Sequence, residues 1–253
     1  WNTPPFEEEM SVTNSMLCNL HSDLQYRKIE CLHSTIMNNF GIVPEVFRAG
    51  RWGYDDTVGE QLNRLRYTAD TSVTPFSDWS EYQGPDFSST VSVEPYMISI
   101  PNDSRTETED CLMEIPVSIG FLQKNFVMMN RVMKILRTRP FQSFHMLGIL
   151  RRLKLLNFVW LSPELSTTED MVGLFKAFVE KGHTLVNMMF HSTSLVPAKS
   201  PFVPDEHALE IFYSKIEGFL HFATEQGAET AMLSDAARHY RKIRSCSVGP
   251  AQI

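Results

Sequence analysis

The sequence lacks the patterns that most often mark a cofactor, a disulfide framework or a membrane anchor. Its 253 residues include four cysteines, at positions 18, 31, 111 and 246, and none of them stands in a Cys-x-x-Cys pair or in metal-ligand spacing. This predicts neither a zinc site nor disulfides, and reduced thiols are expected. No apolar run approaches the roughly 20 residues that a membrane helix needs, so no membrane span is expected.

An excess of basic residues is also missing, because the formal net charge is -7 at pH 7. A protein that binds the phosphate backbone of nucleic acid has a basic face, so no nucleic-acid partner is expected. Residues 137–154 are locally basic, but apolar residues recur among them at helical spacing. This pattern favours a solvated helix face over an anion site.

The first residues lack the features of a natural start. The chain opens at Trp1 with Asn-Thr-Pro-Pro, without Met and without a signal-peptide layout. We interpret it as N-terminally truncated, and we expect a cytoplasmic protein. A hydrophobic content of 43% suffices for one large core, so residues 1–243 are predicted to form one domain. Residues 244–253 carry no core signal and are predicted to be a disordered tail.

Short apolar runs alternate with amphipathic segments, which predicts strands that alternate with helices. Repeated strand-then-helix units indicate a parallel sheet, with the loops at the strand C-termini on one face. A closed or distorted β/α barrel and an open doubly wound sheet both fit. The chain length and the absence of Gly-x-Gly-x-x-Gly favour the barrel. Strands are expected near 44–53, 67–73, 90–100, 111–117, 184–190 and 230–233, and helices within 10–40, 55–66, 125–137, 143–156, 166–182, 205–225 and 234–243.

Polar clusters follow three of the expected strands, and they are candidates for chemistry. An arginine, a carboxylate and an imidazole on one surface would supply the fixed positive charge, the acid and the proton donor that hydrolysis requires. The histidine at a strand end either exchanges a proton near neutral pH or caps a loop, and both readings stay open. The clusters are Arg48 with Arg51, Asp70 with Thr71 and Ser72, and His191 with Ser192 and Ser194.

A nucleophile is not evident in the sequence. The Gly-x-Ser-x-Gly motif is absent, which argues against an acyl-serine hydrolase. Attack by activated water is the better expectation, and water at neutral pH normally needs a metal to lower its pKa. The eight histidines are scattered and form no convincing metal cluster. The sequence therefore predicts the arginine, the acid and the histidine of a hydrolytic site, but not the residues that would bind its metal.

Four segments together resemble one known family. They are residues 47–53 (Phe-Arg-Ala-Gly-Arg-Trp-Gly), 70–73 (Asp-Thr-Ser-Val), 114–117 (Glu-Ile-Pro-Val), and 190–195 (Phe-His-Ser-Thr-Ser-Leu) with Ser-Pro-Phe at 200–202. In this order the set resembles the polysaccharide deacetylase superfamily, the NodB-like enzymes of carbohydrate esterase family 4. Within it, a bacterial exopolysaccharide-locus branch is the most similar. The similarity covers nearly the whole chain.

The resemblance implies an α/β fold, a distorted (β/α)7 barrel that here lacks its first strand or strands, with residues 1–243 as the catalytic domain. It implies a hydrolase that removes acetyl groups from N-acetylated sugars of a polysaccharide or glycolipid precursor by metal-bound water. Arg48 resembles the arginine that orients the catalytic base, and Asp70 resembles the acid that holds this arginine. His191 resembles the general acid that protonates the departing amine.

The resemblance also implies a divalent metal, which is expected to be zinc. In the family an Asp-Asp pair and two histidines supply the catalytic base and the ligands, and here they would stand before Trp1, so no ligand is expected in this chain. The acetylated glycan is expected to contact Trp1, Asn2, Arg51, Trp52, Trp79, Ser192 and Ser194.

Other interpretations stay open. A non-catalytic relative that binds a glycan or a partner in exopolysaccharide assembly is the main alternative. A glycosidase on a similar barrel needs two carboxylates about 5 to 10 Å apart, and Asp70 and Glu114 are the strand-end candidates. The aromatic residues within 76–87, which include Trp79, either form a lid that stacks on sugar or fill the core.

Overall fold

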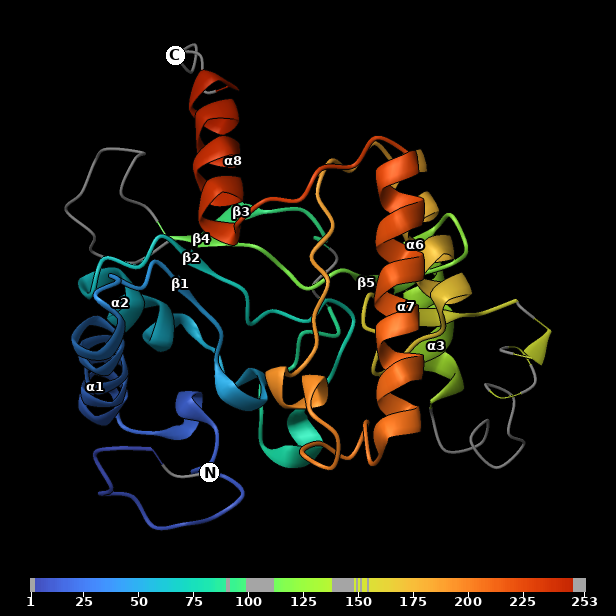
Figure 1. The fold of residues 1–253 in the computed structure, drawn as a ribbon. Coiled ribbons are helices and arrows are strands. Elements are labelled where there is room, and N and C mark those ends of the chain that lie inside the picture. The colour runs from blue at the N-terminus through green and yellow to red at the C-terminus, as the bar shows by residue number, and fades with distance from the viewer. Residues whose placement is uncertain are drawn as a thin grey trace. The chain divides into compact units, whose positions relative to one another are not determined.

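The computed structural model describes residues 3–89, 92–98, 112–137, 148, 150, 152–153 and 155–247, without the side chains of residues 244–247. Helices and short strands form two compact units (Figure 1). Unit 1 comprises Trp1–Phe87, Glu94–Pro116 and Ala231–Ile253, and unit 2 comprises Ser88–Val93 and Val117–Thr230. The chain therefore passes from unit 1 into unit 2 twice, and after each passage it returns to unit 1.

A four-stranded sheet with the order β1-β2-β4-β3 organises unit 1. Strands β1 (Val46–Phe47), β2 (Ala69–Asp70) and β4 (Met113–Glu114) run parallel, as the sequence predicted, and β3 (Tyr96–Met97) is antiparallel to β4. The register places Asp70 beside Glu114, and Glu114 beside Tyr96. Paired residues of neighbouring strands point to the same face, so these side chains form one row.

Helices α1 (Ser22–Phe40) and α2 (Asp56–Arg64) pack against each other in unit 1 (Figure 1). Helix α2 begins where the sequence predicted, because the Asp55 carboxylate accepts a hydrogen bond from the Val58 N–H at 2.9 Å. Three short 3-10 turns, η1 (Leu17–Asn19), η2 (Gly50–Trp52) and η3 (Ser80–Tyr82), lie in the connections. The buried core consists of Ile29, Phe47, Ala49, Tyr54, Val58, Leu62, Tyr67, Val73 and Leu112.

Unit 2 has a two-stranded sheet of β5 (Ile119–Phe121) and β6 (Phe158–Trp160). The two strands are antiparallel, which the prediction of repeated parallel units did not include. Helix α3 (Phe126–Leu136) follows β5, and α6 (Thr168–Glu180) packs along α7 (Glu206–Glu225) (Figure 1). Edge-to-face contacts of Phe175 with Phe219 and Phe222, at 6.1 and 5.8 Å, join α6 to α7.

The start of α6 differs by one residue from the predicted capping box. The cap is Thr167, whose hydroxyl accepts the Asp170 N–H at 3.2 Å. The expected cap, Ser166, instead donates its hydroxyl to the Trp160 carbonyl at 2.7 Å. Because β6 takes up the Ser166 hydroxyl, the next residue caps the helix.

Residues 184–190 do not form the predicted strand. The Ser118 N–H donates to the Asn187 carbonyl at 3.1 Å, but the Asn187 N–H donates back to the Ser118 hydroxyl at 2.8 Å. A side-chain oxygen thus stands where a strand would offer a carbonyl, and the ladder does not continue. The Met189 N–H makes one further bond, to the Leu161 carbonyl at 3.0 Å. The segment lies beside β5 and β6 and is bonded to the residues next to them at Asn187 and Met189, without forming a strand.

The C-terminal part is more helical than predicted. Residues 230–232 form no strand, and α8 (Leu233–Ser247) extends four residues beyond the expected end at 243. The expected tail therefore starts inside a helix, and residues 248–253 lie outside the described residues. Most of the predicted helix at 143–156 also lies outside them.

The pairings of the described strands make one four-stranded and one two-stranded sheet. The closed barrel stays a prediction. Across the described ranges, no helix combines the length and the apolar character that crossing a membrane requires.

An ion pair with little exposure attaches the N-terminal segment to α1. The Lys28 ammonium lies 2.8 Å from the Glu8 carboxylate, and both side chains are less than a tenth exposed. The same ammonium donates to the carbonyls of Thr3 and Pro5, the latter at 2.8 Å. A buried ammonium needs such partners, so Lys28 fixes the path of the chain that precedes α1.

Lys28→Met should lower the free energy of unfolding by about 2 kcal/mol or more, because it removes charge-assisted bonds and leaves the Glu8 carboxylate without its partner. Urea unfolding followed by circular dichroism measures this loss. Arg27→Met is the matched control, since Arg27 pairs with Glu7 and Asp23 at the exposed surface. Equal stability of the two variants would show that the Lys28 pair is not structural.

Candidate functional site

Arg48 lies directly after β1 and is bound by the residue that follows β2. Its Nε donates to the Thr71 carbonyl at 3.1 Å, and its Nη2 donates to the Thr71 hydroxyl at 3.2 Å. The guanidinium carbon lies 5.6 Å from the centre of the Trp52 ring, within the range of a cation-π contact. The guanidinium is thus held in one orientation at the carboxyl ends of the parallel strands, as the sequence predicted.

Asp70 and Glu114 end β2 and β4, and both are fully buried. The Asp70 carboxylate accepts the Ser72 N–H at 2.8 Å and the Ser72 hydroxyl at 2.9 Å. Glu114 Oε1 accepts the Val73 N–H at 3.0 Å. The hydrogen bonds of Arg48 run to Thr71, so Asp70 acts on Arg48 through its charge and not as the direct holder that the resemblance implied.

The electrostatics of this cluster are dominated by burial. Burial raises the pKa of Asp70, and it raises the pKa of Glu114 well above its usual value, which the Asp70 charge increases further. Burial also lowers the pKa of Arg48, whereas the charges of Asp70 and Glu114 raise it. The two carboxyl groups therefore oppose each other's ionisation, while each of them favours the charged form of the Arg48 guanidinium.

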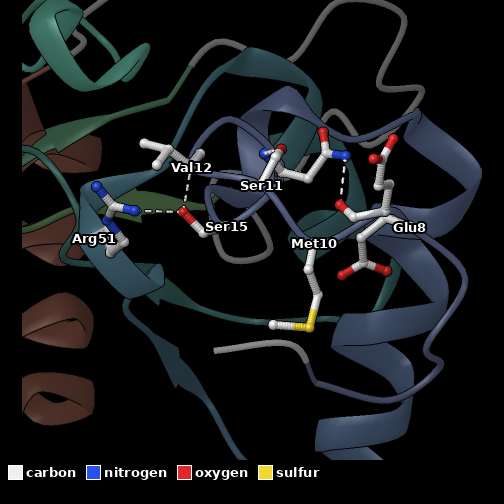
Figure 2. Close-up of a pocket in the computed structure, with 8 residues that line it drawn as sticks. Glu8, Met10, Ser11, Val12, Ser15 and Arg51 are labelled. Carbon is white, nitrogen blue, oxygen red and sulfur yellow. Dashed lines mark hydrogen bonds between the residues drawn. The ribbon is translucent and has the colours of Figure 1, made fainter.

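Arg51 and Trp52 form a strained turn three residues beyond Arg48. Both have positive φ, 56° and 62°, a conformation that non-glycine residues rarely adopt. The Arg51 guanidinium donates to the Ser15 hydroxyl, which donates in turn to the Val12 carbonyl at 2.5 Å (Figure 2). Strain of this kind persists where surrounding contacts enforce it, and it often accompanies binding sites.

Arg51 also lines a cavity of about 510 Å³ in unit 1 (Figure 2). The rest of the lining comes from the N-terminal segment, and two of its apolar side chains, Met10 and Val12, are 76% and 57% exposed. Cavities of this size accommodate small organic ligands. The lining residues are Glu8, Glu9, Met10, Ser11, Val12, Asn14, Ser15 and Arg51.

The aromatic segment 76–87 divides between the two roles that the sequence left open. Phe76 is fully buried and Phe87 packs against the core of unit 1. Trp79 is half-buried, and its indole N–H donates to the Thr74 hydroxyl at 2.9 Å. Tyr82 is 45% exposed and lies 6.0 Å from the Arg51 guanidinium carbon. Only the part near Tyr82 has a surface that a ligand can reach beside Arg51.

Arg51→Gly should be more stable than Arg51→Ala by about 1 kcal/mol, because both lose the bond to Ser15 but only glycine relieves the positive φ. Urea unfolding of the two variants gives the difference directly. Lys176→Gly against Lys176→Ala in α6 is the control pair, where alanine should be the more stable residue. If Arg51→Ala equals or exceeds Arg51→Gly, the turn is not strained.

In unit 2, His191 is paired with a buried glutamate. His191 Nδ1 lies 2.9 Å from Glu164 Oε2, and the His191 backbone N–H donates to Glu164 Oε1 at 2.9 Å. The Glu164 side chain is 1% exposed and that of His191 is 60% exposed. A carboxylate only accepts hydrogen bonds, so Nδ1 carries the proton and Nε2 faces away from Glu164. The imidazole is also stacked on Phe202, with ring centres 5.9 Å apart and planes 13° apart.

Two serines complete the environment of Glu164. The Ser194 hydroxyl donates to Glu164 Oε1 at 2.5 Å and lies 2.8 Å from the Ser200 hydroxyl. Ser192 opens the short turn η4 (Ser192–Leu195) and is exposed. The two serines predicted to contact substrate therefore differ in exposure. Ser194 is buried against Glu164, whereas Ser192 is accessible at the surface.

Sequence reasoning missed Glu164. It follows β6 after Leu-Ser-Pro, as a polar residue at the end of an apolar run, which is the same signal that drew attention to Asp70 and His191. The strand at 158–160 had not been recognised, because it is short and adjoins the locally basic stretch. Unless that strand is recognised, the sequence does not place Glu164 at the edge of a sheet.

Glu164→Ala should lower the free energy of unfolding by about 2 kcal/mol, since it leaves the His191 N–H and the Ser194 hydroxyl without their acceptor. Amide hydrogen exchange should accelerate at residues 191–195 and stay unchanged in α6. Glu229→Ala, at an exposed position of the same unit, is the control. Unchanged protection of the His191 amide in Glu164→Ala would contradict the proposed arrangement.

The predicted residues fall into two groups. Arg48, Arg51, Asp70, Trp52 and Trp79 lie in unit 1, whereas His191, Ser192 and Ser194 lie in unit 2. Their meeting at a single rim stays a prediction. Trp1 and Asn2 lie outside the described residues.

The described residues also include no group of three or more histidine, cysteine, aspartate or glutamate side chains that could hold a metal ion. No protein-family model, curated protein or solved structure matches this chain.

Proposed function

We propose that this chain functions as a metal-dependent hydrolase that removes acetyl groups from N-acetylated sugars of a polysaccharide or glycolipid precursor. The observation that carries the proposal is the pair of His191 and Glu164. A buried carboxylate orients an exposed imidazole and fixes which nitrogen bears the inward proton. The resemblance to NodB-like deacetylases with a distorted (β/α)7 barrel supports the same reaction.

His191 has the properties of a general acid for amide hydrolysis. When the C–N bond of an acetamide breaks, the departing amine needs a proton, and a positioned imidazole delivers it. The bond to Glu164 and the stacking on Phe202 reduce the orientations that the ring can adopt. A reduced set of orientations lowers the entropy that the transition state has to lose.

Arg48 supports the proposal from unit 1. Its guanidinium is held by Thr71 and balanced by the charges of Asp70 and Glu114. A fixed cation at this position can keep a neighbouring carboxylate base ionised and oriented. In the proposal, Arg51 and Trp52 are the glycan contacts of unit 1, and Arg51 makes its contact from the cavity that it lines. Ser192 is the glycan contact of unit 2.

The described residues do not fit a metal by themselves, since they offer no suitable cluster of ligands. We therefore derive no step through the metal. The resemblance assigns the zinc ligands and the catalytic base to residues before Trp1.

The burial of Asp70 and Glu114 argues against a glycosidase. Its two carboxyl groups have to flank the scissile bond, about 5 to 10 Å apart. Asp70 and Glu114 are both fully buried and lie on neighbouring strands in direct register. Neither carboxyl group can reach a sugar.

The full reading frame that encodes this chain, loaded with zinc or cobalt, should release acetate from N-acetylated oligosaccharides. His191→Ala should lower kcat by about 100-fold or more, the usual contribution of a general acid. His221→Ala is the matched control, because His221 lies at the exposed surface of α7 beside Glu225. Oligosaccharide binding without acetate release would favour a non-catalytic glycan-binding relative, and equal activity of His191→Ala would exclude His191 as the acid.

A further inference from the structure

Asp70 and Glu114 are neighbours in the interior of unit 1, where two ionised carboxylates would repel each other. They are register partners on parallel strands, which lie about 4.8 Å apart, and their side chains share one face of the sheet. Neither residue has any exposed surface. In such surroundings two negative charges repel strongly, and one carboxyl group keeps its proton.

The hydrogen-bond inventory of the pair also requires a proton. Oxygens of Asp70 accept from Ser72, and Glu114 Oε1 accepts from Val73. Glu114 Oε2 is buried and has no donor among the described residues. Two neighbouring carboxyl groups can form a hydrogen bond with each other only when one of them is protonated. Burial and the Asp70 charge both raise the pKa of Glu114, which favours Glu114 as the group that keeps the proton.

The pair fixes the segment that holds Arg48. Residues 70–73 follow β2, and their amides at Ser72 and Val73 are bound by Asp70 and Glu114. Thr71 lies between Asp70 and Ser72, and its carbonyl and hydroxyl oxygens accept both hydrogen bonds from Arg48. The Ser72 hydroxyl additionally accepts the Ala49 N–H at 2.8 Å, just before the strained turn at Arg51 and Trp52.

We propose that Asp70 and Glu114 share one proton, and that Glu114 is a positioning residue that fixes the Arg48 guanidinium through residues 70–73. The significance of Arg48 rests on the proposed function, whereas the shared proton does not. A pair that holds one proton carries one negative charge, which the charge of Arg48 balances. Glu114 therefore sets both the position and the charge balance of the arginine.

Other titratable groups face the pair from the neighbouring elements. They are Arg48 after β1, Tyr54 before α2 and Tyr96 on β3, and the charge of Asp56 on α2 acts on both tyrosines. Burial raises the pKa of Tyr54 and of Tyr96, so both phenols stay neutral at neutral pH. Asp56 is exposed to solvent, which screens its charge. Arg48 is the cation among these groups.

The raised pKa of both acids gives stability a definite dependence on pH. The folded protein keeps a proton that the unfolded chain releases above the ordinary glutamate pKa of 4.5. The contribution to stability is complete below that value and is lost as pH rises through the folded-state pKa. Glu114→Gln cannot ionise, so it should remove this part of the slope.

Urea unfolding of the 253-residue chain between pH 5 and pH 8 tests the shared proton. The folding equilibrium constant of the wild type should fall relative to that of Glu114→Gln by about tenfold or more over this range. Glu217→Gln, at an exposed position of α7, is the control and should keep the wild-type slope. Parallel pH profiles of the wild type and Glu114→Gln would overturn the shared proton.

Infrared spectroscopy detects the proton directly. At pH 7 the wild type should show the carbonyl stretch of a buried protonated carboxylic acid, which shifts on labelling glutamate with carbon-13 and disappears in Glu114→Gln. Absence of this band from the folded wild type would mean that both groups are ionised, and would overturn the proposal.

The positioning role is read from the Arg48 side chain by nuclear magnetic resonance, with Arg48→Lys to assign the Nε–H signal. Glu114→Gln keeps the acceptor for Val73 and can donate to Asp70, so the protection of the Arg48 Nε–H against exchange should be retained. Glu114→Ala loses both bonds, so exchange should accelerate about tenfold or more. Unchanged protection in folded Glu114→Ala would exclude the positioning role.

Glu114→Met serves if the alanine variant does not fold, because it keeps a similar side-chain volume without the hydrogen bonds. Protection of Arg48 in Glu114→Met equal to the wild type would overturn the proposal in the same way. None of these measurements depends on acetate release. These measurements can therefore contradict the shared proton or the positioning role without contradicting the deacetylase proposal. Likewise, absence of acetate release would contradict the deacetylase proposal without contradicting the shared proton.

Discussion

A carboxyl group that is buried has to receive hydrogen bonds or keep a proton, and this requirement shapes the candidate site in each unit. In unit 1, Asp70 and Glu114 bind the amides of the segment that follows β2. In unit 2, Glu164 collects an amide, an imidazole and a hydroxyl from the segment around His191. In both places a buried acid sets the geometry of a more exposed residue, Arg48 in unit 1 and His191 in unit 2.

This arrangement separates two kinds of polar residue. In the proposed reaction Arg48 and His191 supply the charge and the proton, while the buried acids hold the segments around them in place. The groups that donate hydrogen bonds to a buried carboxylate stay in place, because no water molecule can replace them as donors. A short strand end therefore becomes a rigid support, even though β2 and β4 have two residues each.

The sequence predicted the elements whose signals are local. Helices α2 and α7 begin directly after Asp55 and Asp205, whose side chains cap them. Both helices show apolar residues at helical spacing. Predictions of secondary structure failed where contacts with residues far away in the sequence determine the local conformation. Residues 184–190 have a strand composition, but the Ser118 hydroxyl takes the bond that a ladder would need. The antiparallel pairing of β5 with β6 likewise depends on partners almost 40 residues apart.

For the candidate site, the sequence identified the residues with visible chemistry and missed those that hold them. Arg48, Asp70 and His191 stood out as polar residues after apolar runs. Glu164 did not, because its strand is three residues long and its role depends on a contact across 27 residues. The sequence also identified Asp70 and Glu114 as strand-end acids, but it did not place them side by side, because their adjacency arises from the register between β2 and β4 and from no local pattern.

The return of the chain to unit 1 has a consequence for its synthesis. Helix α8 contacts β2, and its Arg241 donates to the Thr68 carbonyl, while Arg238 pairs with Glu45 at 3.0 Å. These partners are translated some 170 to 190 residues before α8 emerges from the ribosome. Unit 2 is a continuous stretch apart from one short segment. The contacts of α8 with β2 and its neighbours therefore form only after the whole of unit 2 has been translated.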